Sequence, residues 1–172
     1  MKHASAFLIP LILGGCGPAP DAPPANEAGA PPNPYAFEIN LTFTPRAVDK
    51  LAATKERVTV DASYFGAAIS ETAPGVDDYG QEIGLGGDMI EIAPANALVK
   101  APGTGFDAKN IASIKGEPEV LVNVYSARKT HDDNILSCGI YQGPVKMAQK
   151  QPVDIRCDLI YGADGEPLPA PN

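Results

Sequence analysis

The amino-acid sequence predicts a mainly β protein, a β-sandwich of about six to eight strands with one or two short helices. The main observation is the alternation of apolar and polar residues, which is typical of half-buried strands, in residues 37–43, 58–64, 120–124, 136–140 and 153–159. The second observation is that turns containing Gly or Pro separate these segments at short spacing. The alternative is an α+β fold, an antiparallel sheet with helices on one face.

The alternation also predicts which side chains share the buried face of a strand. Leu136, Cys138 and Ile140 have the same phase, so they are expected to point to the same side of their strand. In the last strand, Cys157 shares the phase of its apolar neighbours. Both cysteines are therefore predicted to face the interior.

Shorter strands are predicted at residues 89–93 and 97–100, on either side of Pro94-Ala95-Asn96. The glycine-rich stretch Gly84–Asp88 ("GLGGD") lacks the spacing of a phosphate-binding loop, and the pattern that follows it is a strand rather than a helix. It is expected to form a tight turn or a bulge.

Two helices are predicted from their start signals. Thr44 can cap a helix in which Pro45 is the first residue, and the apolar residues Val48, Leu51 and Ala52 follow at helical spacing. A second, shorter helix is expected to start at Gly143-Pro144 and to stop before Pro152. Both helices are too short to dominate the fold.

The N-terminus has the layout of a secretory signal. Met1–His3 is a short basic start, and Ala4–Leu13 is an apolar run too short to span a bilayer. Small residues follow at Gly14 and Gly15, immediately before Cys16. A buried helix or a transmembrane anchor is disfavoured by the length of the run and by Pro10 within it.

The stretch Leu13-Gly14-Gly15-Cys16 resembles the lipobox of bacterial lipoproteins at every position. The resemblance implies that residues 1–15 are a signal peptide, that cleavage follows Gly15, and that the Cys16 thiol carries diacylglycerol, with palmitate among the acyl chains expected. The residue after Cys16 is Gly17 rather than Asp, and in this it resembles lipoproteins that are sorted to the outer membrane. The expected location is the cell outer membrane, lipid-anchored and facing the periplasm, because two or three acyl chains make a stable anchor.

The rest of the chain divides by composition. Residues 16–34 are the lipidated cysteine and a Pro/Ala-rich linker, which can hold a domain up to ~55 Å from the lipid surface. Residues 35–161 are the expected mostly-β folded domain, long enough for one hydrophobic core. Residues 162–172 are expected to be a disordered tail.

Three cysteines leave one without a partner unless Cys16 is lipidated. Cys138 and Cys157 then remain, and a disulfide between them is expected because an exported compartment is oxidising. Two separate buried thiols are the alternative. Without residues 1–15 the formal charge is −9, and no basic patch points to nucleic acid.

The densest polar cluster lies in the segment Arg128–Asn134, where Arg128, His131, Asp132, Asp133 and Asn134 form a possible ligand loop. Its oxygens could ligate a cation such as Ca²⁺, but the spacing lacks the glycine and distal Glu of an EF-hand. A turn is the simpler prediction. His131 is the one histidine after cleavage, so we expect no catalytic set, no metal and no cofactor.

The folded domain, including "VNVYSARKTHDDNILSC" (residues 122–138), is similar to small proteobacterial lipoproteins of unassigned function. The expected role is that of a non-catalytic binding or accessory module of the cell envelope, with an envelope protein as partner. The alternative is a solute- or cation-binding lipoprotein that uses Arg128–Asn134 or Asp77–Glu82. A hydrolase that uses only carboxylates is the third prediction.

Overall fold

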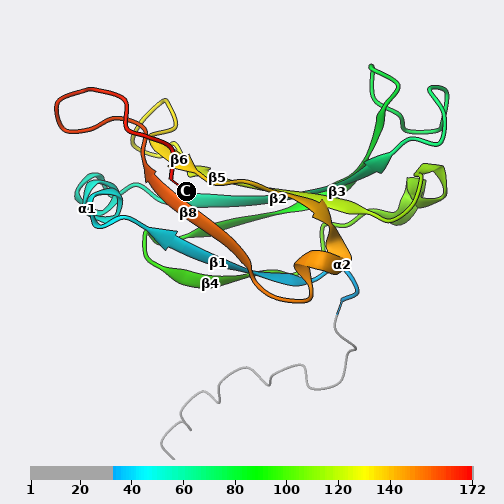
Figure 1. The fold of residues 1–172 in the computed structure, drawn as a ribbon, viewed down its shortest axis with the longest axis horizontal. Helices are drawn as coiled ribbons and strands as arrows, with labels where there is room; N and C mark the ends of the chain where they lie inside the picture. The colour runs from blue at the N-terminus through cyan, green and yellow to red at the C-terminus, as the bar shows by residue number, and fades with distance from the viewer. Residues whose placement is uncertain (1–32, 172) are drawn as a thin grey trace, which may run out of the picture. The chain divides into compact units, whose positions relative to one another are not determined.

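A computed structural model of the chain describes residues 33–171, which form a β-sandwich of two four-stranded sheets (Figure 1). The sheets have the strand orders β4-β1-β8-β6 and β3-β2-β5-β7. The predicted β-sandwich is therefore confirmed. The elements are β1 (Phe37–Phe43), α1 (Pro45–Thr54), β2 (Val58–Ala67), β3 (Glu82–Ile92), β4 (Ala97–Ala101), the 3₁₀ helix η1 (Ala108–Ser113), β5 (Glu119–Ser126), β6 (Leu136–Cys138), β7 (Tyr141–Pro144), α2 (Val145–Ala148) and β8 (Val153–Leu159).

The two α-helices connect one sheet to the other. The chain passes from β1 through α1 to β2, and later from β7 through α2 to β8, and each passage changes sheet. As a result β1 and β8 lie side by side and parallel, with Ile39 opposite Val153 and Phe43 opposite Cys157. The other strand pairs in the described part of the chain are antiparallel.

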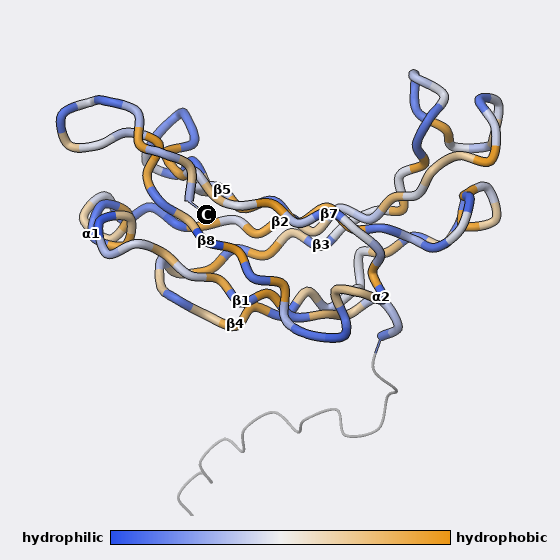
Figure 2. The backbone as a smooth tube through the Cα atoms, in the orientation of Figure 1, coloured by the Kyte–Doolittle hydropathy of each residue, from blue (hydrophilic) through white to orange (hydrophobic). Residues whose placement is uncertain are grey.

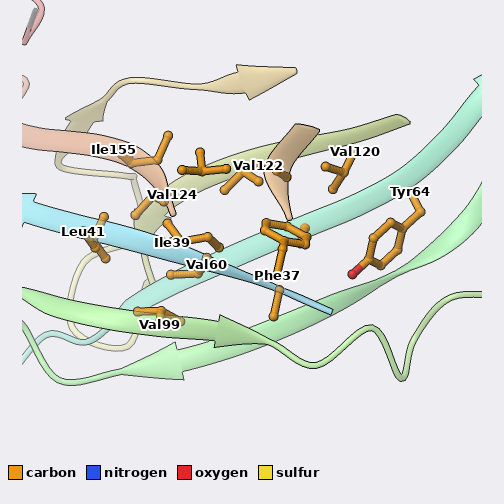
Figure 3. Packing of buried hydrophobic residues seen from close by; sticks show 14 of the residues in the cluster. Phe37, Ile39, Leu41, Val60, Tyr64, Val99, Val120, Val122, Val124 and Ile155 are labelled. Atoms are coloured by element: carbon orange, nitrogen blue, oxygen red, sulfur yellow. The ribbon is translucent and has the colours of Figure 1, made fainter. Parts of the chain in front are cut away.

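The core lies between the sheets and is built from the apolar phases of the strands. Hydrophobic residues gather along the strands of both layers (Figure 2). Figure 3 shows side chains of β1 and β8 pointing toward those of β2 and β5, among them Ile39, Ile155, Val60 and Val122. These four side chains are almost completely buried. Burial of one such aliphatic side chain contributes about 1.5–3 kcal/mol, so this shared core stabilises the pairing of the sheets.

Helix α1 forms as its start signals predict. The Thr44 hydroxyl accepts a hydrogen bond from the Ala47 N–H, and Pro45 occupies the first turn, where no N–H is needed. The helix ends at Lys55, whose φ of 57° is left-handed and turns the chain back toward the sheet. The next residue, Glu56, consequently enters the protein interior.

The prediction for the segment 136–144 is wrong in two details. The Ile140 side chain, expected to face the interior, is 67% exposed. Strand β6 ends at Cys138, after which Gly139 bonds to Arg156 and the chain crosses to the other sheet. Residues 141–144 form β7, and helix α2 begins only at Val145.

The glycine-rich stretch Gly84–Asp88 forms a bulge within β3, which starts well before the predicted strand at residue 89. The register between β2 and β3 shifts here, and Gly86 has a φ of 81°. The loop before η1 approaches this bulge so closely that a Cβ on Gly105 would lie 1.8 Å from the Gly87 carbonyl oxygen. Glycine is required on the loop because the two backbones are in direct contact.

The segment after β8, where the sequence predicts a disordered tail, contains a hydrogen-bonded turn. Tyr161 pairs with Pro167 in an antiparallel bridge, and the Leu168 N–H donates to the Ile160 carbonyl at 2.9 Å. Leu168, a lone large apolar residue in an otherwise polar and proline-rich segment, is half-buried. The described chain thus begins beside α2 and ends at the opposite end of the sandwich, near α1 (Figure 1).

Candidate functional site

The residues of the predicted ligand loop, Arg128–Asn134, do not converge on one point. Arg128 has a φ of 55°, and its guanidinium lies 6.0 Å from the centre of the Tyr125 ring. Asn134 points inward, where its side-chain oxygen accepts hydrogen bonds from the N–H groups of Ser126 and Leu136. Asn134 therefore fixes the turn between β5 and β6, as expected of a turn asparagine.

The same loop surrounds the buried carboxylate of Glu56, which is not among the residues of the predicted ligand set. Glu56 accepts hydrogen bonds from the Arg57 N–H at 3.0 Å, the Lys129 N–H at 3.0 Å, and both the N–H and the hydroxyl of Thr130 at 2.8 and 2.7 Å. We name this arrangement the Glu56 clasp. It attaches the loop after β5 to the start of β2.

Hydrogen bonding keeps Glu56 ionised inside the protein. Burial alone would raise the pKa of this carboxyl group, but the four hydrogen bonds of the clasp outweigh burial and lower the pKa to about 2. The clasp thus resembles an anion-binding site whose anion is a side chain of the same protein.

The remaining residues of the predicted ligand set lie at the rim of the clasp. His131 is half-buried, with its Nδ1 3.7 Å from a Glu56 oxygen and 3.1 Å from the Thr130 hydroxyl. Asp132 and Asp133 are exposed at the tip of the loop. Within residues 33–171, no three His, Cys, Asp or Glu residues gather closely enough to hold a metal ion. Cation or solute binding here stays a prediction, and thermal stabilisation by added Ca²⁺ would test it.

A surface ion-pair network reinforces the clasp from outside. Glu91 of β3 contacts Arg57 at 2.6 Å and Lys129 at 3.0 Å. The hydrogen bond from Lys129 is the main reason that the pKa of Glu91 is lowered. Exposed pairs of this kind contribute little to stability, so the buried carboxylate is the main attachment.

A second buried carboxylate, Asp88 of β3, holds the loop before η1. It accepts hydrogen bonds from the Gly103 N–H at 2.6 Å, the Gly105 N–H at 2.8 Å and the Tyr64 hydroxyl at 2.9 Å. Burial, together with this bond and the charge of Asp88, raises the pKa of Tyr64. The phenol consequently remains a neutral donor to the carboxylate.

A third buried carboxylate, Asp158, attaches α1 to β8. Arg46 binds it through two nitrogens, and the hydroxyl of Thr44 donates to it at 2.7 Å. The Arg46 hydrogen bond is the largest cause of its pKa of about 2, with the Leu159 N–H adding a further bond. This acid therefore anchors the first turn of the helix.

The signal for one of these acids was present in the sequence. Glu56 lies two residues before β2 and has the same phase as Val58, Val60 and Ala62, so the alternation, continued back from the strand, places a charged residue on the buried side. Asp88 and Asp158 give no comparable signal. The bulge changes the phase of β3 before Asp88, and Asp158 lies on the outward phase of β8.

The second predicted ligand loop, Asp77–Glu82, binds its own backbone. A side-chain oxygen of Asp77 accepts hydrogen bonds from the N–H groups of Gln81 at 2.9 Å and Glu82 at 3.2 Å. The Gln81 bond is the main reason that the pKa of Asp77 is lowered. Asp77 thus closes the turn that leads into β3.

Cys138 and Cys157 form a disulfide, as predicted. They lie directly opposite each other on β6 and β8, with their Cα atoms 4.1 Å apart. The bond attaches the three-residue strand β6 to its neighbour. Cys16, the predicted lipidation site, lies outside the described residues.

In residues 33–171, every buried side-chain nitrogen and oxygen atom has a hydrogen-bond partner. No helix of that range is long and apolar enough to span a bilayer. Comparison with known protein families, with curated proteins and with solved structures finds no match for this chain.

Proposed function

We propose that this protein is a lipoprotein anchored in the outer membrane, and that its β-sandwich acts as a non-catalytic binding or accessory module of the cell envelope. The anchor is supported by Leu13-Gly14-Gly15-Cys16, the match to a lipobox. It is also supported by the cysteines, because Cys138 and Cys157 are paired with each other and Cys16 remains for the lipid. A disulfide suits an exported protein, whose compartment is oxidising.

The observation that carries the non-catalytic role is the use made of the buried acids. Each of Glu56, Asp88 and Asp158 accepts its hydrogen bonds from groups of the same chain and attaches a loop or helix to the sandwich. Two of them have a pKa near 2, too low for a general acid or base at neutral pH, where a pKa near the working pH is most effective. Their geometry supports a scaffold that presents its surface to a partner.

Crosslinking in living cells tests the proposal. The full-length wild-type chain and the Cys16→Ser variant are crosslinked and purified, and the captured proteins are identified by mass spectrometry. The same cells are fractionated. We expect the wild type in the outer-membrane fraction with one specific envelope protein, and Cys16→Ser outside that fraction without it.

Each part of the proposal has its own contrary outcome. If Cys16→Ser remains wholly with membranes, the lipid anchor is wrong. If the anchored wild type captures only abundant proteins that are also captured by an unrelated lipoprotein, the accessory role is wrong.

A further inference from the structure

Strand β3 lies at the edge of its sheet, and its first half is paired on the outer side by the loop before η1. The last bond of this pairing runs from the Gly87 N–H to the Gly105 carbonyl at 3.1 Å. Within residues 33–171, no strand or bridge continues it along the second half of β3. We call this second half, Asp88–Ile92, the open edge.

We propose that the open edge pairs with the open edge of a second copy of this chain, so that two sandwiches share one continuous sheet about a twofold axis at Ile90. The pairing is antiparallel, with Met89 of one copy opposite Glu91 of the other. The inference goes beyond the proposed accessory role, because the partner is the protein itself.

The peptide groups of the open edge are arranged for this pairing. The outward direction alternates along a strand, so the peptide groups of Met89 and Glu91 point away from β2, as that of Gly87 does. A twofold axis at Ile90 places Met89 opposite Glu91 of the other copy, and each such pair exchanges two hydrogen bonds. The Glu91 carbonyl otherwise receives one long bond of 3.4 Å, from the Arg57 guanidinium. The symmetric pairing therefore satisfies the outward peptide groups of both copies.

The side chains of the open edge also suit contact with a second copy. Met89 is 73% exposed, and Ile90 and Ile92 are half-buried although they face the core, because β3 is the last strand of its sheet. Glu91 is the one exposed charged residue of the segment, and ion pairs with two basic residues of the same copy already neutralise it. In the twofold pairing Glu91 lies opposite Met89, so like charges do not meet. Association removes the apolar side chains from water.

The other free edges of the sandwich carry features that oppose pairing. Strand β6 has three residues, and β7 has four and ends at Pro144. Strand β4 carries the exposed Lys100. Short edge strands, proline and lysine are devices by which natural sheets avoid association. The open edge has neither lysine nor proline, so among the edges of the described sandwich it is the one best suited to pairing.

The proposed lipid anchor favours a second copy as the occupant, and this step rests on that anchor. Anchored copies are confined to one surface, which raises their effective concentration for one another. A twofold axis perpendicular to the shared sheet keeps Asn33 of both copies on the same side of the dimer. Because residues 16–34 can span up to ~55 Å, both lipids can enter one bilayer.

Cysteine crosslinking of the full-length protein in living cells tests the pairing and its register. In Ile90→Cys the two introduced cysteines face each other across the axis, as Cys138 and Cys157 face each other within one copy. Ile92→Cys is the matched control, since Ile92 is half-buried on the same face but lies opposite Asp88 of the other copy. After oxidation with copper phenanthroline, the disulfide-linked dimer is quantified on non-reducing gels.

We expect Ile90→Cys to give at least ~10-fold more linked dimer than Ile92→Cys, because position 90 lies on the axis. Adding Met89→Pro removes an outward N–H without breaking a bond to β2 and should abolish the dimer. Met89→Lys, which changes only the side chain, should lower it strongly. Adding Gln142→Pro, which removes an outward N–H of β7, should leave it unchanged. Retention of the native disulfide shows that each variant is folded.

Equal crosslinking at positions 90 and 92 would overturn the proposal, as would the absence of a dimer in Ile90→Cys or equal losses from Met89→Pro and Gln142→Pro. If Ile90→Cys gives no dimer but Met89→Pro prevents capture of an envelope protein, the open edge binds a strand of that protein and not a second copy. A dimer with no envelope partner would retain this inference and disprove the accessory role.

Discussion

The Glu56 clasp and the Asp77–Glu82 loop both use one carboxylate to fix a turn, but over very different distances along the chain. Asp77 bonds to N–H groups four and five residues away, and its side chain faces solvent. Glu56 bonds to Lys129 and Thr130, 73 and 74 residues away, and it is buried. The bonds of Asp77 order a single turn. The bonds of Glu56 join two segments that are far apart in sequence and come together only in the folded protein.

The difference predicts unequal contributions to stability. When a buried acid loses its four hydrogen bonds, water cannot reach the donors to replace those bonds. At an exposed acid, water can take over the lost bonds. Four experiments test whether the buried and the exposed carboxylates differ in this way, and they are given in decreasing order of the loss of stability that we expect.

Acid should have the largest effect, because it removes two buried charges together. The pKa values of Glu56 and Asp158 are lowered in the folded protein from 4.5 and 3.8 to about 2. Their contribution is therefore complete above pH 5 and is lost as the pH falls toward 2. We expect the free energy of unfolding to fall by on the order of 5 kcal/mol between pH 5 and pH 2.

Urea unfolding at a series of pH values measures this loss. The variant Glu56→Gln is the control, since its curve should lack the Glu56 part of the decline and be flatter than the wild-type curve. Parallel curves for the two proteins would show that Glu56 does not have a lowered pKa in the folded state.

Replacing Glu56 itself should have the next largest effect. Glu56→Gln keeps the size of the side chain but places an NH₂ group against the N–H donors of Lys129 and Thr130. We expect a loss of about 3 kcal/mol in the free energy of unfolding at pH 7. Asp132→Asn removes one charge from the exposed tip of the same loop and should change the value by less than ~0.5 kcal/mol. Equal effects of the two variants would contradict the clasp.

Alternation made much of this fold predictable. The inward phases of β1, β2, β5 and β8 follow directly from the sequence, as do the cap and the first turn of α1. The errors lie where the chain changes sheet. Gly139 ends the pairing of β6, so Ile140 loses the phase that its neighbours predict. A short strand such as β7 has too few residues to show a period.

The candidate site was less predictable, because its contacts join residues far apart in sequence. The sequence shows that Arg128–Asn134 is polar, but it does not show that Glu56 enters that loop from another element. Asn134 could be recognised as a turn residue from its type alone. The bonds of Asp88 and Asp158 depend on a bulge and on the position of a helix, which local patterns do not encode.

Replacing Asp158 should have an intermediate effect. Asp158→Asn removes the charge that Arg46 binds but keeps an oxygen that can accept from Thr44. We expect a loss of about 2 kcal/mol, measured by urea unfolding at pH 7. Arg46→Met should cost less, since it leaves Asp158 bonded to Thr44 and the Leu159 N–H. A larger loss for Arg46→Met than for Asp158→Asn would mean that packing of the arginine, rather than the buried charge, attaches α1.

Replacing Asp77 should have the smallest effect. Asp77→Asn retains an oxygen that can accept from the Gln81 and Glu82 N–H groups, and water can reach both donors. The melting temperature should therefore fall much less than in Glu56→Gln. Hydrogen exchange gives a sharper measurement, because opening of this turn should speed exchange at Gln81 and leave the Thr130 N–H protected. Faster exchange at Thr130 in Asp77→Asn would show that the two loops are coupled, and the contrast between local and distant attachment would then fail.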